Sequence, residues 1–118
     1  MTSLIACLST GKGTWTEILH LMKAEEWDKV YLITNKFGKE KFSADPKTEF
    51  IVTDFNKTVK EIADDVYRQL NGKVSGFEVA LNLISGAGKE HMAIMAALIK
   101  CGLGFRIVNM GEKGVEEL

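Results

Sequence analysis

The sequence has few of the features that mark secreted, membrane or disordered proteins. It contains 2 cysteines and 1 proline among 118 residues, so neither a disulfide framework nor a proline-rich linker is expected. Its longest apolar run, residues 92–99, is far shorter than the ~20 residues of a membrane-spanning helix. With a net charge of −1, the chain also lacks the basic excess that attracts long nucleic acid. We therefore expect a cytoplasmic protein with neither a membrane nor long nucleic acid as its partner.

What the chain does have is an alternation of short apolar runs with segments of helical period. This pattern predicts strands over residues 4–8, 30–34, 50–53, 77–83 and 105–108, and helices over residues 14–22, 58–70 and 89–101. Two of these helices are expected to begin with a capping box, one from Thr14 to Glu17 and the other from Thr58 to Glu61. Residues 35–47 have room for one short helix, and the acidic tail from residue 111 is expected to be frayed or a single helical turn. Because no hairpin signal separates the strands, residues 1–118 are predicted to form one α/β domain. Its expected fold is Rossmann-like and doubly wound, a mainly parallel sheet of five to six strands with helices on both faces.

The main candidate site follows the fourth predicted strand. Ser85-Gly86-Ala87-Gly88-Lys89 leads from this strand into a helix, and such a turn presents backbone N–H groups at the positive end of the helix dipole. Lys89 adds a full positive charge, so the pattern favours a phosphate-binding site. Leu83 and Glu90 stand where an ATPase P-loop needs glycine and Ser or Thr, which disfavours that class. The alternative is that the glycines only fit a tight turn.

A second turn of the same kind follows the first predicted strand. Its ligand candidates are Ser9, Thr10, Gly11, Lys12, Gly13 and Thr14, with hydroxyls and a lysine that suit phosphate or ribose oxygens. If the first and fourth strands are neighbours, both turns meet at the carboxyl edge of the sheet, where ligands bind in open α/β folds. Asn82 and Asn35 end strands at that edge, and Asn35 is either a ligand contact or an ordinary turn residue. Trp15 is expected either to stack on a base or to belong to the core.

Metal and acid–base chemistry have weak support in the sequence. The histidines, His20 and His91, are far apart and lack ligand-like neighbours, so we expect no metal and no cofactor. Of the candidate carboxylates, only Asp54 is predicted near the carboxyl edge, whereas Asp64 and Asp65 are expected on a solvated helix face. The apolar run of residues 92–99 falls within one helix, and a sheet can cover only one side of it. The other side is therefore expected to meet a second copy in a homodimer.

Three segments resemble CARF domains (CRISPR-associated Rossmann fold). The pattern Asn82-x-x-Ser85-Gly86-Ala87-Gly88-Lys89-x-x-Met92 is similar to the second signature of that family, a strand that ends in a small Gly-rich turn with a basic residue. The segment 32–35 is similar to the family's second strand, and residues 9–14 are similar to its first ligand loop. Ala87-Gly88 differs from the Gly-Thr that commonly precedes the lysine.

This resemblance implies that a homodimer cleft binds a cyclic oligoadenylate messenger of CRISPR antiviral defence. It leaves open a sensor, a buffering protein or a ring nuclease, the last with Lys89 and Ser9 as catalytic residues. In a ring nuclease the 2′-hydroxyl beside each phosphodiester attacks in line, and Lys89 stabilises charge on the phosphate. This reaction requires no metal. The alternative function is an interaction or assembly module without a small-molecule ligand.

Overall fold

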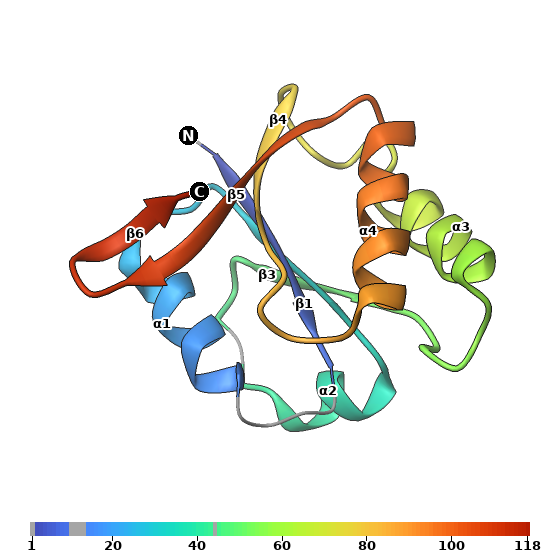
Figure 1. Ribbon diagram of the computed structural model, residues 1–118, viewed down its shortest axis with the longest axis horizontal. Helices are drawn as coiled ribbons and strands as arrows, with labels where there is room; N and C mark the ends of the chain where they lie inside the picture. Colours follow the sequence, from blue (N-terminus) through green and yellow to red (C-terminus); the bar gives the residue numbers. More distant parts are fainter. Residues whose placement is uncertain (1, 10–13, 44) are drawn as a thin grey trace.

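The computed structural model describes residues 2–9, 14–43 and 45–118. The strands in it are β1 (Ser3–Leu8), β2 (Val30–Thr34), β3 (Thr48–Val52), β4 (Glu78–Asn82), β5 (Gly104–Gly111) and β6 (Gly114–Glu117). The helices are α1 (Trp15–Ala24), α2 (Lys36–Lys41), α3 (Val59–Leu70) and α4 (Gly88–Lys100). The strands form one sheet in the order β3-β2-β1-β4-β5-β6. In Figure 1, α3 and α4 lie together on one side of the sheet and α1 lies on the other. Every strand pair is parallel except β5–β6, which confirms an α/β fold with a mainly parallel sheet.

β1 lies in the middle of the sheet, and its side chains alternate between two apolar layers. Ile5 and Cys7 pack with residues of α3 and α4 on one face. Leu4, Ala6 and Leu8 pack with residues of α1 on the other face. Because both faces are covered, all of β1 is buried, and this explains why the strand is an unbroken apolar run in the sequence.

The two helix starts with capping-box spacing behave differently. At α3 the capping box is present: Thr58 Oγ1 accepts the Glu61 N–H, and the Glu61 carboxylate accepts the Thr58 N–H. At α1 the Thr14 side chain makes no capping hydrogen bond, so the expected capping box of that helix is wrong. Thr14 has helical backbone angles rather than the extended ones that a capping side chain needs.

The expected frayed or helical tail is also wrong. β5 continues to Gly111, and Gly114 starts β6, which pairs antiparallel with β5 through Met110 opposite Val115. Gly114 has a φ of +120°, which suits the turn between the two strands. The sequence signal was weak because Val115 alone in this acidic segment packs against the core.

The apolar helix α4 is covered by more than the sheet. α3 packs along it, and the buried residues Ala93, Ile94, Ala97 and Leu98 belong to the core layer that they share. Only part of α4 therefore stays uncovered, and Ile99 is the most exposed of its apolar residues, at 67%. No helix in the described part of the chain combines the length and apolar content needed to cross a membrane.

Candidate functional site

The ends of β1 and β4 meet at the carboxyl edge of the sheet, as the sequence predicted for neighbouring strands. Ala6 lies opposite Asn82 in the parallel register of the two strands. Just beyond them, the Ser9 N–H donates to Ser85 Oγ at 3.0 Å, and the two hydroxyl oxygens are 3.4 Å apart. The two predicted ligand turns therefore begin side by side.

Most of the first turn lies outside the described residues. These residues are Thr10, Gly11, Lys12 and Gly13. Of the remaining candidates in that turn, Thr14 comes directly before α1. Ser9 is held from two directions, since its N–H donates to Ser85 and its carbonyl accepts from Trp15 Nε1 at 2.7 Å. Trp15 packs edge-on against Phe42, with ring centroids 5.8 Å apart, so its ring is part of the packing between α1 and the segment after α2.

The second turn, Ser85–Lys89, is shaped by its first glycine. Gly86 has a φ of +102°, which favours glycine, and a Cβ there would lie 3.0 Å from Cys7 Sγ and 3.1 Å from His91 Nε2. A methyl group at this position would press on both atoms and would also stand in a strained backbone conformation. Gly88 is different, because a Cβ on it would meet nothing within 4 Å. Close packing therefore requires glycine at position 86 but not at position 88.

Two predicted ligand residues use their polar side chains inside the fold. Asn82 is buried, donates from Nδ2 to the Val108 carbonyl at 2.9 Å and accepts the Ile84 N–H on Oδ1 at 3.2 Å. Ser85 is 1% exposed, and its hydroxyl accepts the Ser9 N–H. Both residues fix the position of the turn, and this is the role that the structure supports for them.

The helix start that follows the turn carries charges of both signs. Glu90 Oε1 accepts the Ala87 N–H at 3.1 Å, so a carboxylate occupies one of the amide groups that an anion could use. Lys89 Nζ donates to the Phe55 carbonyl at 3.0 Å, in the loop after β3. The Lys89 ammonium is therefore held toward β3, and an anion at the turn would compete with Phe55 for it and with Glu90 for the amide.

Cys7 and His91 lie against the same turn but do not form a nucleophile–base pair. Burial, together with the negative charge of Glu90, raises the pKa of the Cys7 thiol to about 12, so the thiol stays protonated at neutral pH. His91 Nε2 lies 2.8 Å from the Ser85 carbonyl, which can only accept, so Nε2 carries the proton. Within the described residues, no group of three His, Cys, Asp or Glu side chains has the arrangement of a metal site.

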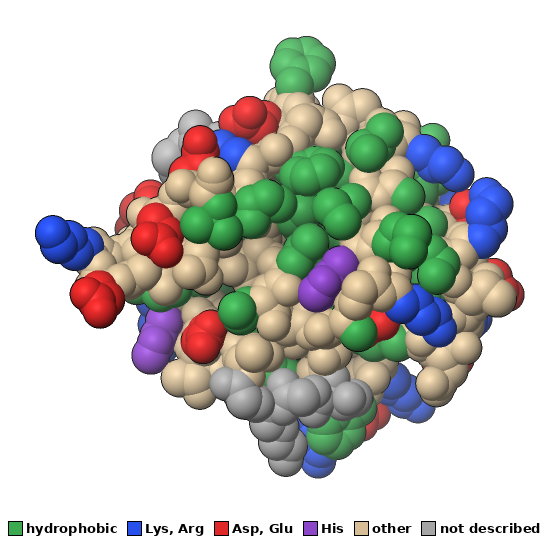
Figure 2. All heavy atoms as spheres, in the orientation of Figure 1, with side chains coloured by type: hydrophobic (Ala, Val, Ile, Leu, Met, Phe, Trp, Pro, Cys, Tyr) green, Lys and Arg blue, Asp and Glu red, His purple; other side chains and the backbone are tan. Residues whose placement is uncertain are grey.

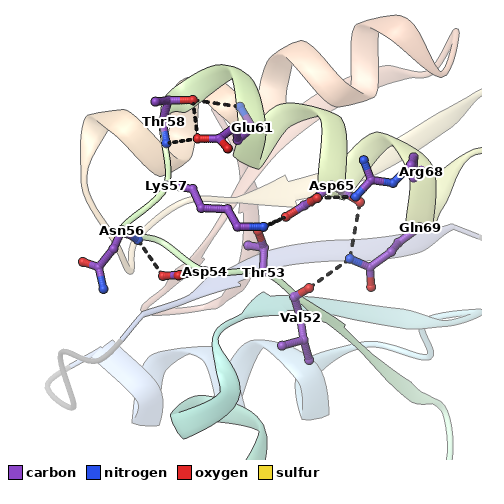
Figure 3. A network of polar contacts seen from close by, with 10 residues as sticks. All are labelled: Val52, Thr53, Asp54, Asn56, Lys57, Thr58, Glu61, Asp65, Arg68 and Gln69. Atoms are coloured by element: carbon purple, nitrogen blue, oxygen red, sulfur yellow. Dashed lines mark hydrogen bonds and ion pairs between the residues drawn. The ribbon is translucent and has the colours of Figure 1, made fainter.

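The exit of β3 carries a polar network that the sequence did not predict (Figure 3). Asp65 on α3 accepts from Thr53 Oγ1 at 3.1 Å and from Lys57 Nζ at 3.3 Å, and it also pairs with Arg68. Burial disfavours the charged form of Asp65, but hydrogen bonds from Thr53, Lys57 and Arg68 outweigh this and lower its pKa.

The expectation that Asp64 and Asp65 share a solvated face is therefore wrong for Asp65. The Asp65 side chain is only 14% exposed, whereas that of Asp64 is 43% exposed and pairs with Lys60 and Lys100. Successive residues of a helix point about 100° apart, so one of two adjacent carboxylates can face the sheet end while the other faces solvent.

A cavity of about 470 Å³ opens beside this network. We call it the β3 cavity, and it is lined by Asn35, Lys36, Phe37, Val52, Thr53, Asp54, Lys57 and Asp65. Asn35 caps α2, because its Oδ1 accepts the Gly38 N–H at 2.8 Å. It therefore acts as the turn residue that the sequence allowed, and it also lines the cavity. A larger cavity of about 610 Å³ lies between α1 and the segment after α2, away from Ser85–Lys89.

No protein-family model matches this chain, and no curated protein matches its sequence. What the chain binds is therefore inferred from the geometry of the carboxyl edge.

Proposed function

We propose that this chain is a nucleotide-binding domain with a Rossmann-like, doubly wound fold of CARF type, and that its ligand is a cyclic oligoadenylate. The observation that supports this function is the contact between Ser9 and Ser85, which joins the exits of β1 and β4 at the start of α4. A ligand at this place meets the N–H groups of the helix start and the ammonium of Lys89. Both groups attract a phosphate.

Glu90 limits how strongly the turn attracts an anion. Its carboxylate accepts the Ala87 N–H, so it places a negative charge beside the proposed phosphate position. This arrangement suits a ligand that has several weakly held phosphates better than a single small anion. A cyclic oligoadenylate has one phosphodiester for each nucleotide and meets that condition.

The proposed assembly is a homodimer that uses the uncovered side of α4. Hydrophobic side chains gather over α4 and β5 in Figure 2. Met92 and Ile99 are exposed there, while Met95, Phe105 and Ile107 are partly buried. This surface begins one helical turn after Gly88, so a second copy on it brings the two Ser85–Lys89 turns toward one symmetry axis. Ile99→Glu is expected to give a monomer in sedimentation, whereas Phe37→Glu on α2 adds the same charge and leaves the dimer intact.

Titration with cyclic tetra-adenylate and cyclic hexa-adenylate tests the function. We expect micromolar binding by calorimetry, and Lys89→Ala is expected to weaken it about tenfold, because a hydrogen bond from a charged group is lost. The matched control is Lys113→Ala, which removes an exposed lysine in the turn between β5 and β6 and is expected to bind as the unchanged chain does. No heat of binding for either ring at micromolar concentration removes the proposal.

Chromatography of the nucleotide after incubation separates a sensor from a ring nuclease. In a cleavage step, a 2′-hydroxyl oxygen attacks the adjacent phosphorus and the bond from phosphorus to the 5′-oxygen breaks. The proton of the 2′-hydroxyl passes to solvent, and the 5′-oxygen takes one up, so the product is linear with a 2′,3′-cyclic phosphate. Lys89 would stabilise the added charge on the phosphate, with Ser9 positioning it. A Lys89→Ala variant that binds less ligand but turns over what it binds at the original rate rules out this role for Lys89.

An assembly module without a small ligand is the second candidate function. It is favoured by Asn82 and Ser85, whose side chains are already used within the fold, and by the exposed Met92 and Ile99. The two functions give different results with a panel of nucleotides. An unchanged melting temperature with every nucleotide, combined with an intact dimer, selects the assembly module.

A further inference from the structure

We propose that the β3 cavity is a subsite for a nucleobase that carries an amino group, such as adenine. This inference deepens the proposed function, because the phosphate of the same ligand would lie at the Ser85–Lys89 turn. It rests on the lining of a cavity that the sequence did not predict, with a volume of about 470 Å³ between α2 and the loop that leads into α3. Cavities of this size hold small organic ligands in other proteins.

The charged groups of the cavity are balanced, and one pair is already satisfied. Lys57 and Asp65 are bonded to each other, so their charges offset within the lining. Lys36 and Asp54 are the remaining charged groups, one of each sign. A free anion would meet the Asp54 carboxylate at short range and a free cation would meet Lys36. A neutral ligand with both donors and acceptors is a better match to this lining.

The polar groups that can reach a ligand fit the edge of an aminated heterocycle. Asp54 Oδ1 accepts the Asn56 N–H at 2.9 Å, and its other oxygen has acceptor capacity for an N–H of a ligand. Asn35 Oδ1 accepts the Gly38 N–H, and its Nδ2 can donate to a ligand. An acceptor at Asp54 and a donor at Asn35 are complementary to an amino group beside a ring nitrogen, which is how the adenine edge is arranged.

Phe37 supplies the apolar wall that a flat ring needs. It is a large hydrophobic side chain with 38% of its surface exposed, although the ring lines the cavity. Its other contact is with Trp15, at a centroid distance of 6.3 Å and an interplanar angle of 49°, and this contact supports the ring from outside the cavity. Stacking of a base on an aromatic side chain contributes about 1–3 kcal/mol in nucleic-acid-binding proteins.

The contact of Lys89 with Phe55 relates the cavity to the proposed phosphate position. β4 and β3 are separated by two strands, so their exits lie about 14 Å apart at the usual strand spacing. The Lys89 side chain crosses part of this distance and ends at the carbonyl of Phe55, the residue next to Asp54. Lys89 thus reaches from the Ser85–Lys89 turn toward the β3 cavity, on the side where the base of the same ligand would enter.

The test uses adenosine, which has the base and no phosphate, and the full chain labelled with ¹⁵N. We expect adenosine to shift the amide signals of residues 35–37 and 53–57. Asp54→Asn keeps an oxygen for the Asn56 N–H but removes the charge, and it is expected to weaken adenosine binding about tenfold. Asp64→Asn makes the same chemical change outside the cavity and is expected to bind as the unchanged chain does.

Phenylalanine provides a second matched pair. Phe37→Ala is expected to weaken adenosine binding at least fivefold because the stacking face is lost. Phe77→Ala removes an 88% exposed phenylalanine just before β4, at the opposite edge of the sheet, and is expected to have no effect. The inference is overturned by adenosine that shifts no signals, by shifts confined to other parts of the chain, or by equal effects of Asp54→Asn and Asp64→Asn.

Titration of cyclic tetra-adenylate on the same signals distinguishes the inference from the function on which it rests. Binding that shifts the signals of Ser85–Lys89 but none of the cavity keeps the proposed function and overturns the nucleobase subsite. If adenosine binds in the cavity but cyclic tetra-adenylate does not bind to the chain, the nucleobase subsite is kept and the proposed function is overturned. In that case the cavity is a nucleoside site and the messenger is not the ligand.

Discussion

The Ser85–Lys89 turn and the β3 cavity lie at the same edge of the sheet but are built differently. The turn comes from five consecutive residues, and its shape depends on one glycine that fits against Cys7 and His91. The β3 cavity takes its lining from β3, the residues after it, α2 and α3. In the turn, local backbone geometry defines the site, whereas in the cavity the site depends on how separate elements pack.

This difference explains why charge acts differently in the two places. At the turn, Lys89 and Glu90 are neighbours at the start of α4 and have different partners, Phe55 and Ala87. At the exit of β3, Lys57 and Asp65 bond directly to each other. At the turn, the Lys89 ammonium bonds to a carbonyl that a ligand can replace, whereas the cavity is lined by equal numbers of positive and negative groups, which suits a neutral ring.

Of the substitutions that test this difference between the turn and the cavity, Gly86→Ala is expected to have the largest effect on stability. The added methyl group would stand in a left-handed backbone conformation and press on Cys7 and His91, so we expect a loss of about 3 kcal/mol of unfolding free energy. Gly72→Ala is the control, because Gly72 has a φ of +82° but open space around it and should lose about 1 kcal/mol. Equal losses in urea unfolding would show that packing at the turn does not matter.

The intermediate effect is expected from Asp65→Asn at the exit of β3. The substitution weakens the hydrogen bonds from Thr53, Lys57 and Arg68, and we expect a loss of about 1–2 kcal/mol at neutral pH by urea unfolding. Asp64→Asn is the control, with an expected change below about 0.5 kcal/mol because its ion pairs are exposed.

The pH dependence of that difference checks its origin. The pKa of Asp65 in the folded chain lies below its usual value of 3.8, so the folded state favours the ionised form. The stabilisation is then fully present above about pH 4 and is lost as the pH falls through the folded pKa. The difference in unfolding free energy between the original chain and Asp65→Asn should therefore shrink below pH 4. If this difference in unfolding free energy stays constant from pH 7 to pH 3, it comes from packing rather than from the charge of Asp65.

The sequence was a good guide to several features that neighbouring residues determine. The apolar runs predicted the parallel strands, the Thr58–Glu61 spacing predicted a capping box that is present, and the Ser85–Lys89 turn lies where the pattern indicated. Each of these depends on residues only a few positions apart.

Two of the failures concern residues that are distant in the sequence, whereas the capping box expected at Thr14 and the missed β6 hairpin involve residues only a few positions apart. The position of Asp65 next to Thr53 depends on how α3 lies across the end of β3, which no local pattern shows. Likewise, the cover that α3 gives to α4 follows from packing between two helices, and a count of apolar residues in α4 alone could not predict it. The antiparallel β6 is a local failure: β5 was expected to stop at residue 108, but it continues to Gly111, and its Met110 pairs with Val115.

The smallest effect, and the finest test of the turn, is expected from Glu90→Gln. Glutamine keeps an oxygen that can accept the Ala87 N–H, so the helix start should keep its shape, but the negative charge beside Lys89 is gone. We expect cyclic tetra-adenylate to bind two- to fivefold more tightly at low salt, since a charge near a helix start changes the free energy by about 0.3–1 kcal/mol. The gain should fade at 0.5 M salt, where exposed charges are screened. Glu112→Gln, in the turn between β5 and β6, is the control and should not change the affinity. If Glu90→Gln and Glu112→Gln bind cyclic tetra-adenylate equally well, the phosphate does not lie at the start of α4. The β3 cavity would then have to hold the ligand without a phosphate contact at that helix start.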